Sequence, residues 1–105
     1  MENNNYALVS ADENGTTIAV KGEMNSETSH SVESGVLAIR AAHPRGKLSI
    51  DASVLEGISR EGVNVFMRLR NNEHNMSVRN TKPEIYKTLR AHGLTHLIDI
   101  EKSSY

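Results

Sequence analysis

The sequence has no cysteine among its 105 residues. Disulfide bonds, thiolate metal sites and cysteine nucleophiles are therefore excluded. Aromatic residues are few, since Phe66 and three tyrosines are the only rings on which the bases of a nucleic acid could stack. No apolar run approaches the roughly 20 residues of a membrane-spanning helix, and the opening residues MENNNYALVS lack the apolar segment of a signal peptide. We therefore expect a cytoplasmic protein with no membrane span and no nucleic-acid partner.

Motifs of catalysis and of metal binding are also missing. Gly57 and Gly62 do not have the spacing of a Walker-type phosphate loop. His92 and His96 are four residues apart, but Gly93 interrupts the helix that would bring both imidazoles to one face. The other histidines are scattered, and no acid–base pair supports catalysis. We expect a protein that is not an enzyme, with no metal and no cofactor.

Length and charge set broader limits. A chain of 105 residues fits one compact domain, which we place at residues 6–102, with flexible termini at 1–5 and 103–105. The formal net charge is only −1. Residues 60–92 nevertheless carry seven basic and three acidic side chains. This region is either a solvated helix surface or a mildly basic face for an acidic partner.

Helix and strand signals alternate along the chain. The β-branched segment 16–20 follows an Asn14-Gly15 turn, a combination typical of a hairpin. Val32, Val36 and Ile39 have the spacing of one helix face, although Gly35 either weakens this helix or allows close packing on the sheet. We expect strands at 6–9, 16–20, 47–51, 76–79 and 96–100, and helices after residue 26 to about 43, at 61–71 and at 83–92.

This order, β-β-α-β-α-β-α-β, predicts an α/β fold. Strands that alternate with helices are typically parallel, and the opening hairpin adds an antiparallel edge. We therefore expect a mixed β-sheet of about five strands with the helices packed on one face. Oligomeric state is beyond what the sequence indicates.

The segment Leu48–Arg70 holds the most informative junction, where an apolar strand ends at Asp51 and a polar loop leads into a helix. Helix N-termini favour anions because free N–H groups and the helix dipole point there. Ser59 is either a helix N-cap, accepting from the N–H of Glu61 or Gly62, or a phosphate acceptor. Arg60 places a positive charge at the positive end of the helix dipole, which is unfavourable. It pairs either with an acidic group of a partner or with a neighbouring glutamate, Glu56 or Glu61.

Four fragments of the sequence resemble the STAS domain (sulfate transporter and anti-sigma factor antagonist). They are Gly22-Glu23-Met24-Asn25, Asp51-Ala52-Ser53, Ile58-Ser59-Arg60-Glu61-Gly62-Val63, and Lys82-Pro83-Glu84-Ile85-Tyr86 with its continuation to Gly93-Leu94. The third is similar to the family pattern Ile-Asp-Ser-Ser-Gly-Leu. The resemblance implies the STAS fold and an anti-sigma factor antagonist, a bacterial protein that binds an anti-sigma factor of serine-kinase type and frees a sigma factor.

One departure from the family pattern concerns regulation. In bacterial antagonists, the serine directly after the aspartate accepts a phosphoryl group from the anti-sigma kinase. The resemblance places Arg60 at that position, Ser59 at the aspartate and Glu61 at the second serine. Because a guanidinium cannot replace the hydroxyl, we expect no phosphorylation at the usual position, and Ser59 is the one hydroxyl left in the loop.

The resemblance also implies where the partner binds, namely at the loop and N-terminus of the second helix. The candidate partner-binding residues are Asn25, Ser26, Ser59, Arg60, Glu61, Val63, Asn64 and Arg68. Asn25 either lines this surface or caps the first helix. One alternative function is a STAS subunit of a multiprotein assembly, such as a stressosome-like scaffold or a lipid-transport ABC complex. Another is an enzyme or sensor that takes an anionic ligand at the same junction.

Overall fold

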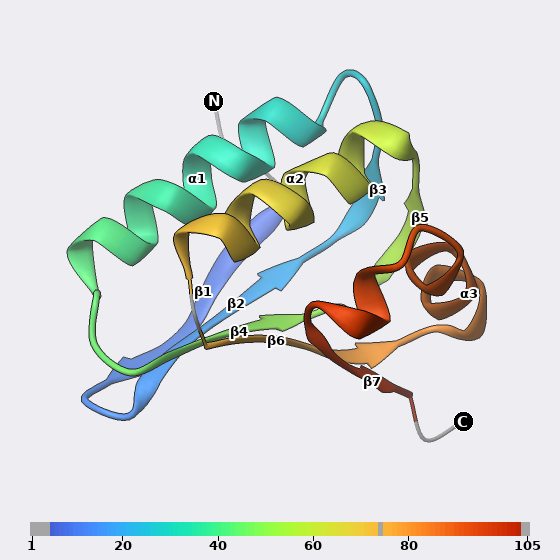
Figure 1. Cartoon of the computed structure of the whole chain (residues 1–105). Helices are drawn as coiled ribbons and strands as arrows, with labels where there is room; N and C mark the ends of the chain where they lie inside the picture. The colour runs from blue at the N-terminus through green and yellow to red at the C-terminus, as the bar shows by residue number, and fades with distance from the viewer. Residues whose placement is uncertain (1–4, 74, 104–105) are drawn as a thin grey trace.

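The computed structural model describes residues 5–73 and 75–103, and its centre is a five-stranded sheet (Figure 1). Its strands lie in the order β1-β2-β4-β6-β7. Their bounds are β1 Tyr6–Asp12, β2 Gly15–Val20, β4 Lys47–Asp51, β6 Met76–Thr81 and β7 Asp99–Lys102. Only β1 and β2 pair antiparallel, and every other neighbouring pair is parallel. The predicted mixed sheet with an antiparallel opening hairpin is confirmed.

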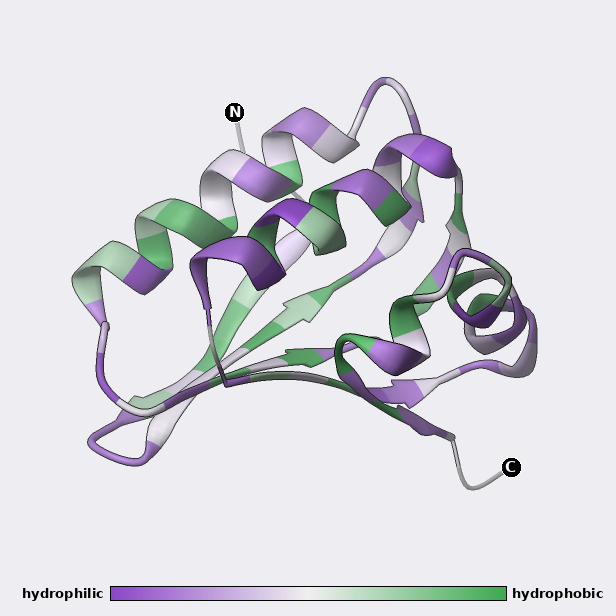
Figure 2. Cartoon of the chain, viewed as in Figure 1, coloured by the Kyte–Doolittle hydropathy of each residue, from purple (hydrophilic) through white to green (hydrophobic). Residues whose placement is uncertain are grey.

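Three helices cover one face of this sheet, as the sequence pattern predicts (Figure 1). They are α1 (Ser29–Ala42), α2 (Arg60–Asn72) and α3 (Pro83–Ala91). Their inward sides are apolar. The outward sides of α2 and α3 are mostly polar, whereas α1 also carries exposed apolar residues, Leu37 among them (Figure 2). Val36 of α1, Phe66 of α2 and Leu89 of α3 are each 0% exposed and belong to one apolar cluster. Burial of these stripes against the strands is the main stabilising term of the fold.

A second, two-stranded sheet was not predicted from the sequence. Strand β3 (Gly22–Met24) pairs in parallel with β5 (Leu55–Ile58). Both segments were interpreted as loops, because three or four residues that include a glycine carry no strand periodicity. The small sheet rises beside the N-terminal ends of α1 and α2 (Figure 1). It therefore supports the junction of loop and helix within Leu48–Arg70 that the sequence identified.

The last strand was predicted too early, at residues 96–100. Residues Leu94–His96 instead form a short 3₁₀ helix, and β7 begins at Asp99. The N–H groups of Leu97 and Ile98 both bond to the carbonyl of Leu94, so they are not available to a strand ladder. Gly93, at φ 82°, ends α3 in the left-handed conformation that a glycine adopts most easily. The predicted end of this helix is confirmed.

Helix α1 packs tightly on the sheet edge at Gly35. A Cβ atom at Gly35 would lie 2.1 Å from Cζ of Tyr6 in β1, so the absence of a side chain lets the tyrosine ring lie against the helix. Of the two interpretations of Gly35, close packing on the sheet is the one observed.

At the two ends of the described chain, Asn5 pairs with Lys21 and Ser103 with Thr81 through backbone hydrogen bonds. The other residues predicted as flexible termini, 1–4 and 104–105, lie outside the described residues.

Candidate functional site

The N-terminus of α2 is fixed to the small sheet by backbone contacts. Strand β5 ends at Ile58, and Ser59 has the extended backbone (φ −95°, ψ −178°) of a helix N-cap. The Ser59 N–H donates to the carbonyl of Met24 in β3 at 2.8 Å. Gly62 lies so close to β3 and β5 that an added Cβ would be 2.7 Å from Cβ of Met24. The first turn of α2 therefore sits directly on the two strands.

Ser59 occupies the N-cap position of α2, which is one of the two interpretations that the sequence left open. Its Oγ makes no cap hydrogen bond and donates instead to Oε1 of Glu61 at 2.8 Å. This bond, the Glu61 backbone N–H and the nearby charge of Arg60 together lower the pKa of Glu61 below its ordinary value. The first turn of α2 thus carries a stable negative charge, which the positive end of the helix dipole favours.

Asn25 caps the turn before α1. Its Oδ1 accepts the N–H groups of Glu27 and Thr28 at 2.9 and 3.1 Å, the pattern of an Asx turn. The Thr28 hydroxyl donates to the carbonyl of Glu23 at 2.6 Å. Because residues 26–28 are held in this turn, α1 begins at Ser29 and not directly after Ser26. Asp51 has a similar role at the end of β4, where its Oδ1 accepts from the N–H of Ser53 at 3.0 Å.

An ion pair joins α2 to α1 near the same end. Arg68 donates through Nε and Nη2 to the two oxygens of Glu33 at 2.9 and 2.8 Å. The Arg68 side chain is 54% exposed and that of Glu33 is 16% exposed. Arg68 was predicted as a partner-binding charge. Glu33 already neutralises the charge of Arg68 within the chain. Of the three guanidinium nitrogens, Nη1 is the one that does not bond to Glu33.

We expect the Glu33–Arg68 pair to make a small, pH-dependent contribution to stability. Arg68, through its hydrogen bond and its charge, lowers the pKa of Glu33. A carboxylate whose pKa is lowered by folding adds stability above its unfolded pKa, and this is lost as the pH falls through the folded value. Glu33→Gln should therefore lower the free energy of unfolding at pH 7 by about 0.5 kcal/mol, with little effect at a pH well below 4.5.

Urea unfolding at both pH values tests this expectation. The matched control is Glu13→Gln in the exposed β1–β2 turn, which should be neutral at both. An equal loss for Glu33→Gln at the two pH values would contradict the assignment of the effect to the ion pair.

Between the N-terminal ends of α1 and α2 lies a shallow groove of about 170 Å³. Its lining residues are Ser26, Ser29, His30, Glu61, Asn64 and Arg68. Four of these, Ser26, Glu61, Asn64 and Arg68, were among the sequence candidates, and the fold brings them together from the loop before α1 and from α2. Ser29 and His30 were missed, because nothing in the sequence indicated which side of α1 faces α2. We name this feature the α1–α2 groove.

The remaining candidates lie outside the groove. Arg60 is exposed at the first position of α2, next to Glu61. Val63 is 2% exposed and belongs to the apolar core. Its prediction as a partner-binding residue is wrong, since the helix turns it toward the sheet. The exposed part of the junction consists of Arg60, Glu61 and Asn64 on α2 and Ser26 on the loop.

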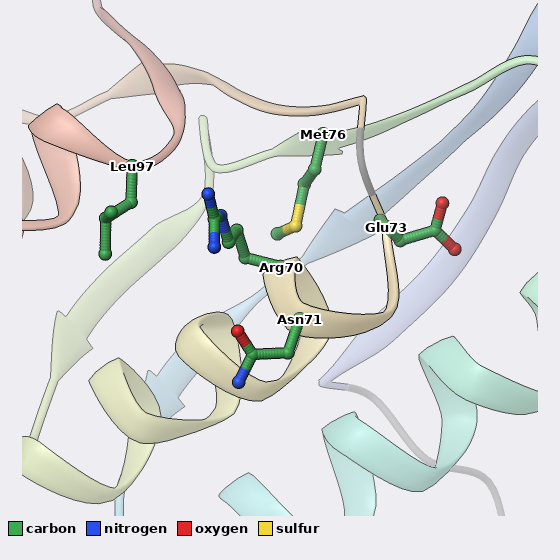
Figure 3. Close-up of a pocket in the computed structure, with 5 residues that line it drawn as sticks. All are labelled: Arg70, Asn71, Glu73, Met76 and Leu97. Atoms are coloured by element: carbon green, nitrogen blue, oxygen red, sulfur yellow. The ribbon is translucent and has the colours of Figure 1, made fainter.

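A second hollow, of about 160 Å³, lies at the opposite end of α2 (Figure 3). Arg70 lies there between Met76 and Leu97, while Glu73 points away and is bound by Arg40 at 2.9 Å. No sequence candidate lines this hollow. Among the described residues, no three histidine or carboxylate side chains are placed to hold a metal ion. No helix in the described part of the chain has the length and apolarity that a membrane crossing requires.

Comparisons with known proteins agree with this architecture. The unphosphorylated anti-sigma factor antagonist SpoIIAA matches with a TM-score of 0.71 and 15% identity, over 90% of this chain and 86% of that one. An anti-sigma factor antagonist from Mycobacterium paratuberculosis matches with a TM-score of 0.78 and 17% identity, over 94% and 87%. The phosphorylated Bacillus cell fate determinant SpoIIAA matches with a TM-score of 0.63 and 14% identity, over 90% and 89%.

At such low identities, these structures establish the fold alone. No curated protein matches the chain. A family model does match, the one described as "Mlab, STAS domain", over residues 7–99. This range runs from the second residue of β1 to the first residue of β7 and includes all three helices and the whole α1–α2 groove. The chain therefore belongs to the STAS domain family.

Proposed function

We propose that the chain is a non-enzymatic interaction module that binds an anti-sigma factor of kinase type, as an anti-sigma factor antagonist does. One observation carries this proposal: in a chain with the STAS fold, the polar side chains of Arg60, Glu61 and Asn64 are exposed where α2 begins. Glu61 and Asn64 lie beside Ser26, which belongs to the loop before α1. A polar, charged surface of this kind suits a reversible contact with another protein.

Regulation by phosphorylation at the usual position is not part of the proposal. Arg60 has no hydroxyl, and the Ser59 hydroxyl is half-buried and bonded to Glu61. Glu61 places a permanent negative charge in the first turn of α2, where a phosphoryl group would otherwise add one. We therefore propose a constitutive binder, tuned by the amount of partner present.

Arg60→Glu tests the proposed surface. The partner is a kinase-type anti-sigma factor encoded in the same genome, and its affinity is measured by calorimetry. Reversal of the exposed charge should weaken binding at least about tenfold, as expected for a charge at the centre of an interface. The matched control is Arg90→Glu, an exposed arginine on α3, which should bind like the wild type. Equal affinities for all three proteins would contradict the proposed surface.

The same kinase gives a second readout on this residue. Incubation with ATP should leave the wild-type mass unchanged, whereas Arg60→Ser should gain one phosphate. Phosphate on the wild-type protein, mapped to Ser59, would overturn the proposed lack of phosphorylation.

A second candidate function is a STAS subunit of a stable multiprotein assembly. The observation that favours it is again Arg60, because a binding surface without a phosphate acceptor suits a permanent complex. Native size-exclusion of the tagged chain from its own host distinguishes the two. An antagonist should migrate as a small protein with a substoichiometric kinase, whereas an assembly subunit should migrate entirely in a large complex of fixed composition.

A further inference from the structure

Strand β1 leaves one edge of the five-stranded sheet open. It pairs with β2 on one side, and among the described residues no strand lies on its other side. The N–H and C=O groups along such an edge are a template for another strand, and proteins usually protect it with charged residues, proline or a β-bulge. Residues 6–11 contain no charge and no proline. The register does shift between Leu8 and Ser10, but Val9 at this point is 57% exposed, so the edge offers an apolar side chain together with its backbone groups.

Helix α1 continues this apolar edge in the layer above the sheet. The Tyr6 ring of β1 lies against Gly35, and Ala42 lines a shallow hollow together with Ala11 of β1. Ala38 lies three residues after Gly35 and four before Ala42, so it faces the same way, and it is exposed. The side of α1 above the open edge therefore consists of small, uncharged residues.

The exposed surface of α1 carries none of the charged residue types. Its two charged residues, Glu33 and Arg40, form ion pairs with residues of α2 and of the position that ends α2. The exposed residues of α1 are one histidine, two serines, one leucine and three alanines. A surface of this composition can meet a copy of itself, because a two-fold axis brings the same patch of both copies together and no like charges then face each other.

The spacing of the two layers suits such a pair of copies. A two-fold axis perpendicular to the sheet would place β1 antiparallel to β1 of the second copy, at about 4.8 Å. Helix α1 contacts both β1 and β2, so its axis lies above the space between them (Figure 1). The same strand spacing then brings the two α1 helices to about 10 Å, and helices pack at roughly 8–10 Å, the shorter distances with small side chains. One arrangement therefore satisfies the strand edge and the helix together.

We propose that β1 and α1 form the interface of a homodimer, in which the two five-stranded sheets join through their β1 strands into one continuous sheet. The proposal goes beyond the proposed function and does not rest on it. Arg60, Glu61 and Asn64 lie on α2, which packs on the other side of α1, so the dimer leaves the candidate surface open. One strand and one helix from each copy make a small interface, and we expect a dissociation constant on the order of 10–100 μM.

Sedimentation velocity of the lone chain tests the dimer, from about 5 μM to about 1 mM, a range that brackets the expected constant. The wild type should shift from monomer to dimer as the concentration rises. Val9→Lys places a charge in the strand edge, opposite the same charge of the second copy, and should weaken the dimer at least about tenfold. The matched control is Val54→Lys, a valine of 47% exposure in the β4–β5 loop, which should dimerise like the wild type.

Ala38→Arg tests the contribution of α1, because two guanidinium groups would then face each other across the axis. It should also weaken the dimer, whereas Ala91→Arg, at an exposed alanine that ends α3, should not. Circular dichroism checks that each variant is folded. In the wild type, backbone amide signals of β1 and α1 in ¹H–¹⁵N correlation spectra should shift with concentration, while those of α3 stay fixed. The proposal is overturned if the wild type stays monomeric, if Val9→Lys or Ala38→Arg dimerises like the wild type, or if the concentration-dependent signals lie outside β1 and α1.

Discussion

Replacement of Arg40 by alanine should lower the free energy of unfolding by about 2–3 kcal/mol, less than the roughly 3–5 kcal/mol for removal of one partner from a fully buried ion pair, because the pair with Glu73 is partly buried. The Arg40 side chain is only 11% exposed. Its Nε and Nη2 donate to the two carboxylate oxygens of Glu73 at 2.9 and 3.1 Å. Without the guanidinium, Glu73, which is 15% exposed, would keep an unpaired charge.

Arg40 also satisfies the turn that joins α1 to β4. Its Nη1 donates to the carbonyls of His43 and Arg45, both at 3.0 Å, and its Nη2 donates to the carbonyl of Gly46. His43 is the C-cap residue of α1 and Arg45 and Gly46 lie in the turn beyond it, so one side chain satisfies three backbone carbonyls that belong to no helix or strand ladder there. The turn itself is tight, because Gly46 has φ 69° and lies directly against the backbone of Asn14.

Urea unfolding of three variants checks the role of Arg40. Arg40→Lys should recover only part of the loss, because an ammonium cannot copy the bidentate contact with Glu73. The control is Arg45→Ala, an exposed side chain in the same turn, which should change stability by no more than about 0.5 kcal/mol. A loss below about 1 kcal/mol for Arg40→Ala would place this network among ordinary surface ion pairs.

The sequence predicts most of this fold because its elements carry local signals. Apolar periodicity, the Asn14-Gly15 turn and the Pro83 and Gly93 helix ends each act over a few residues. The β3–β5 sheet was missed because its strands are short and their pairing joins Gly22 to Leu55, a contact that no local pattern encodes. The network around Arg40 was missed for the same reason, since Glu73 lies 33 positions away.

The candidate site was predicted in outline but not in chemical detail. The family resemblance placed Ser26, Glu61 and Asn64 on one surface, and they do line one groove. For Ser59 the sequence left a helix N-cap and a phosphate acceptor open, and in neither interpretation did the hydroxyl donate to Glu61, as it does in the structure. That choice depends on a side-chain rotamer, and the exposure of Ser29 depends on the rotation of α1 about its axis. The spacing of residues in the sequence specifies neither the rotamer nor the helix rotation precisely enough to predict these contacts.

Replacement of Gly62 by alanine should lower the free energy of unfolding by about 2 kcal/mol, a typical cost of an extra methyl group in a packed site. An added Cβ would lie 2.7 Å from Cγ1 of Ile58 and from Cβ of Met24. Because Met24 Cβ is attached directly to the backbone of β3, rotation of a side chain cannot relieve this contact. Helix α2 must move outward, which strains the bond between the Ser59 N–H and the Met24 carbonyl.

This outward movement should also weaken partner binding, since Arg60, Glu61 and Asn64 all lie in the first turns of α2. Urea unfolding and calorimetry with the kinase-type partner measure the two effects. The matched control is Gly57→Ala in β5, where the nearest atom is Cγ of the exposed Glu23 at 3.3 Å; that side chain can turn away, so both measurements should stay near wild type. Ile58→Ala combined with Gly62→Ala should not restore stability, because the Met24 contact remains. A Gly62→Ala protein as stable as the wild type would mean that α2 moves away from β3 and β5 at little cost, so that these strands do not hold the candidate surface in place.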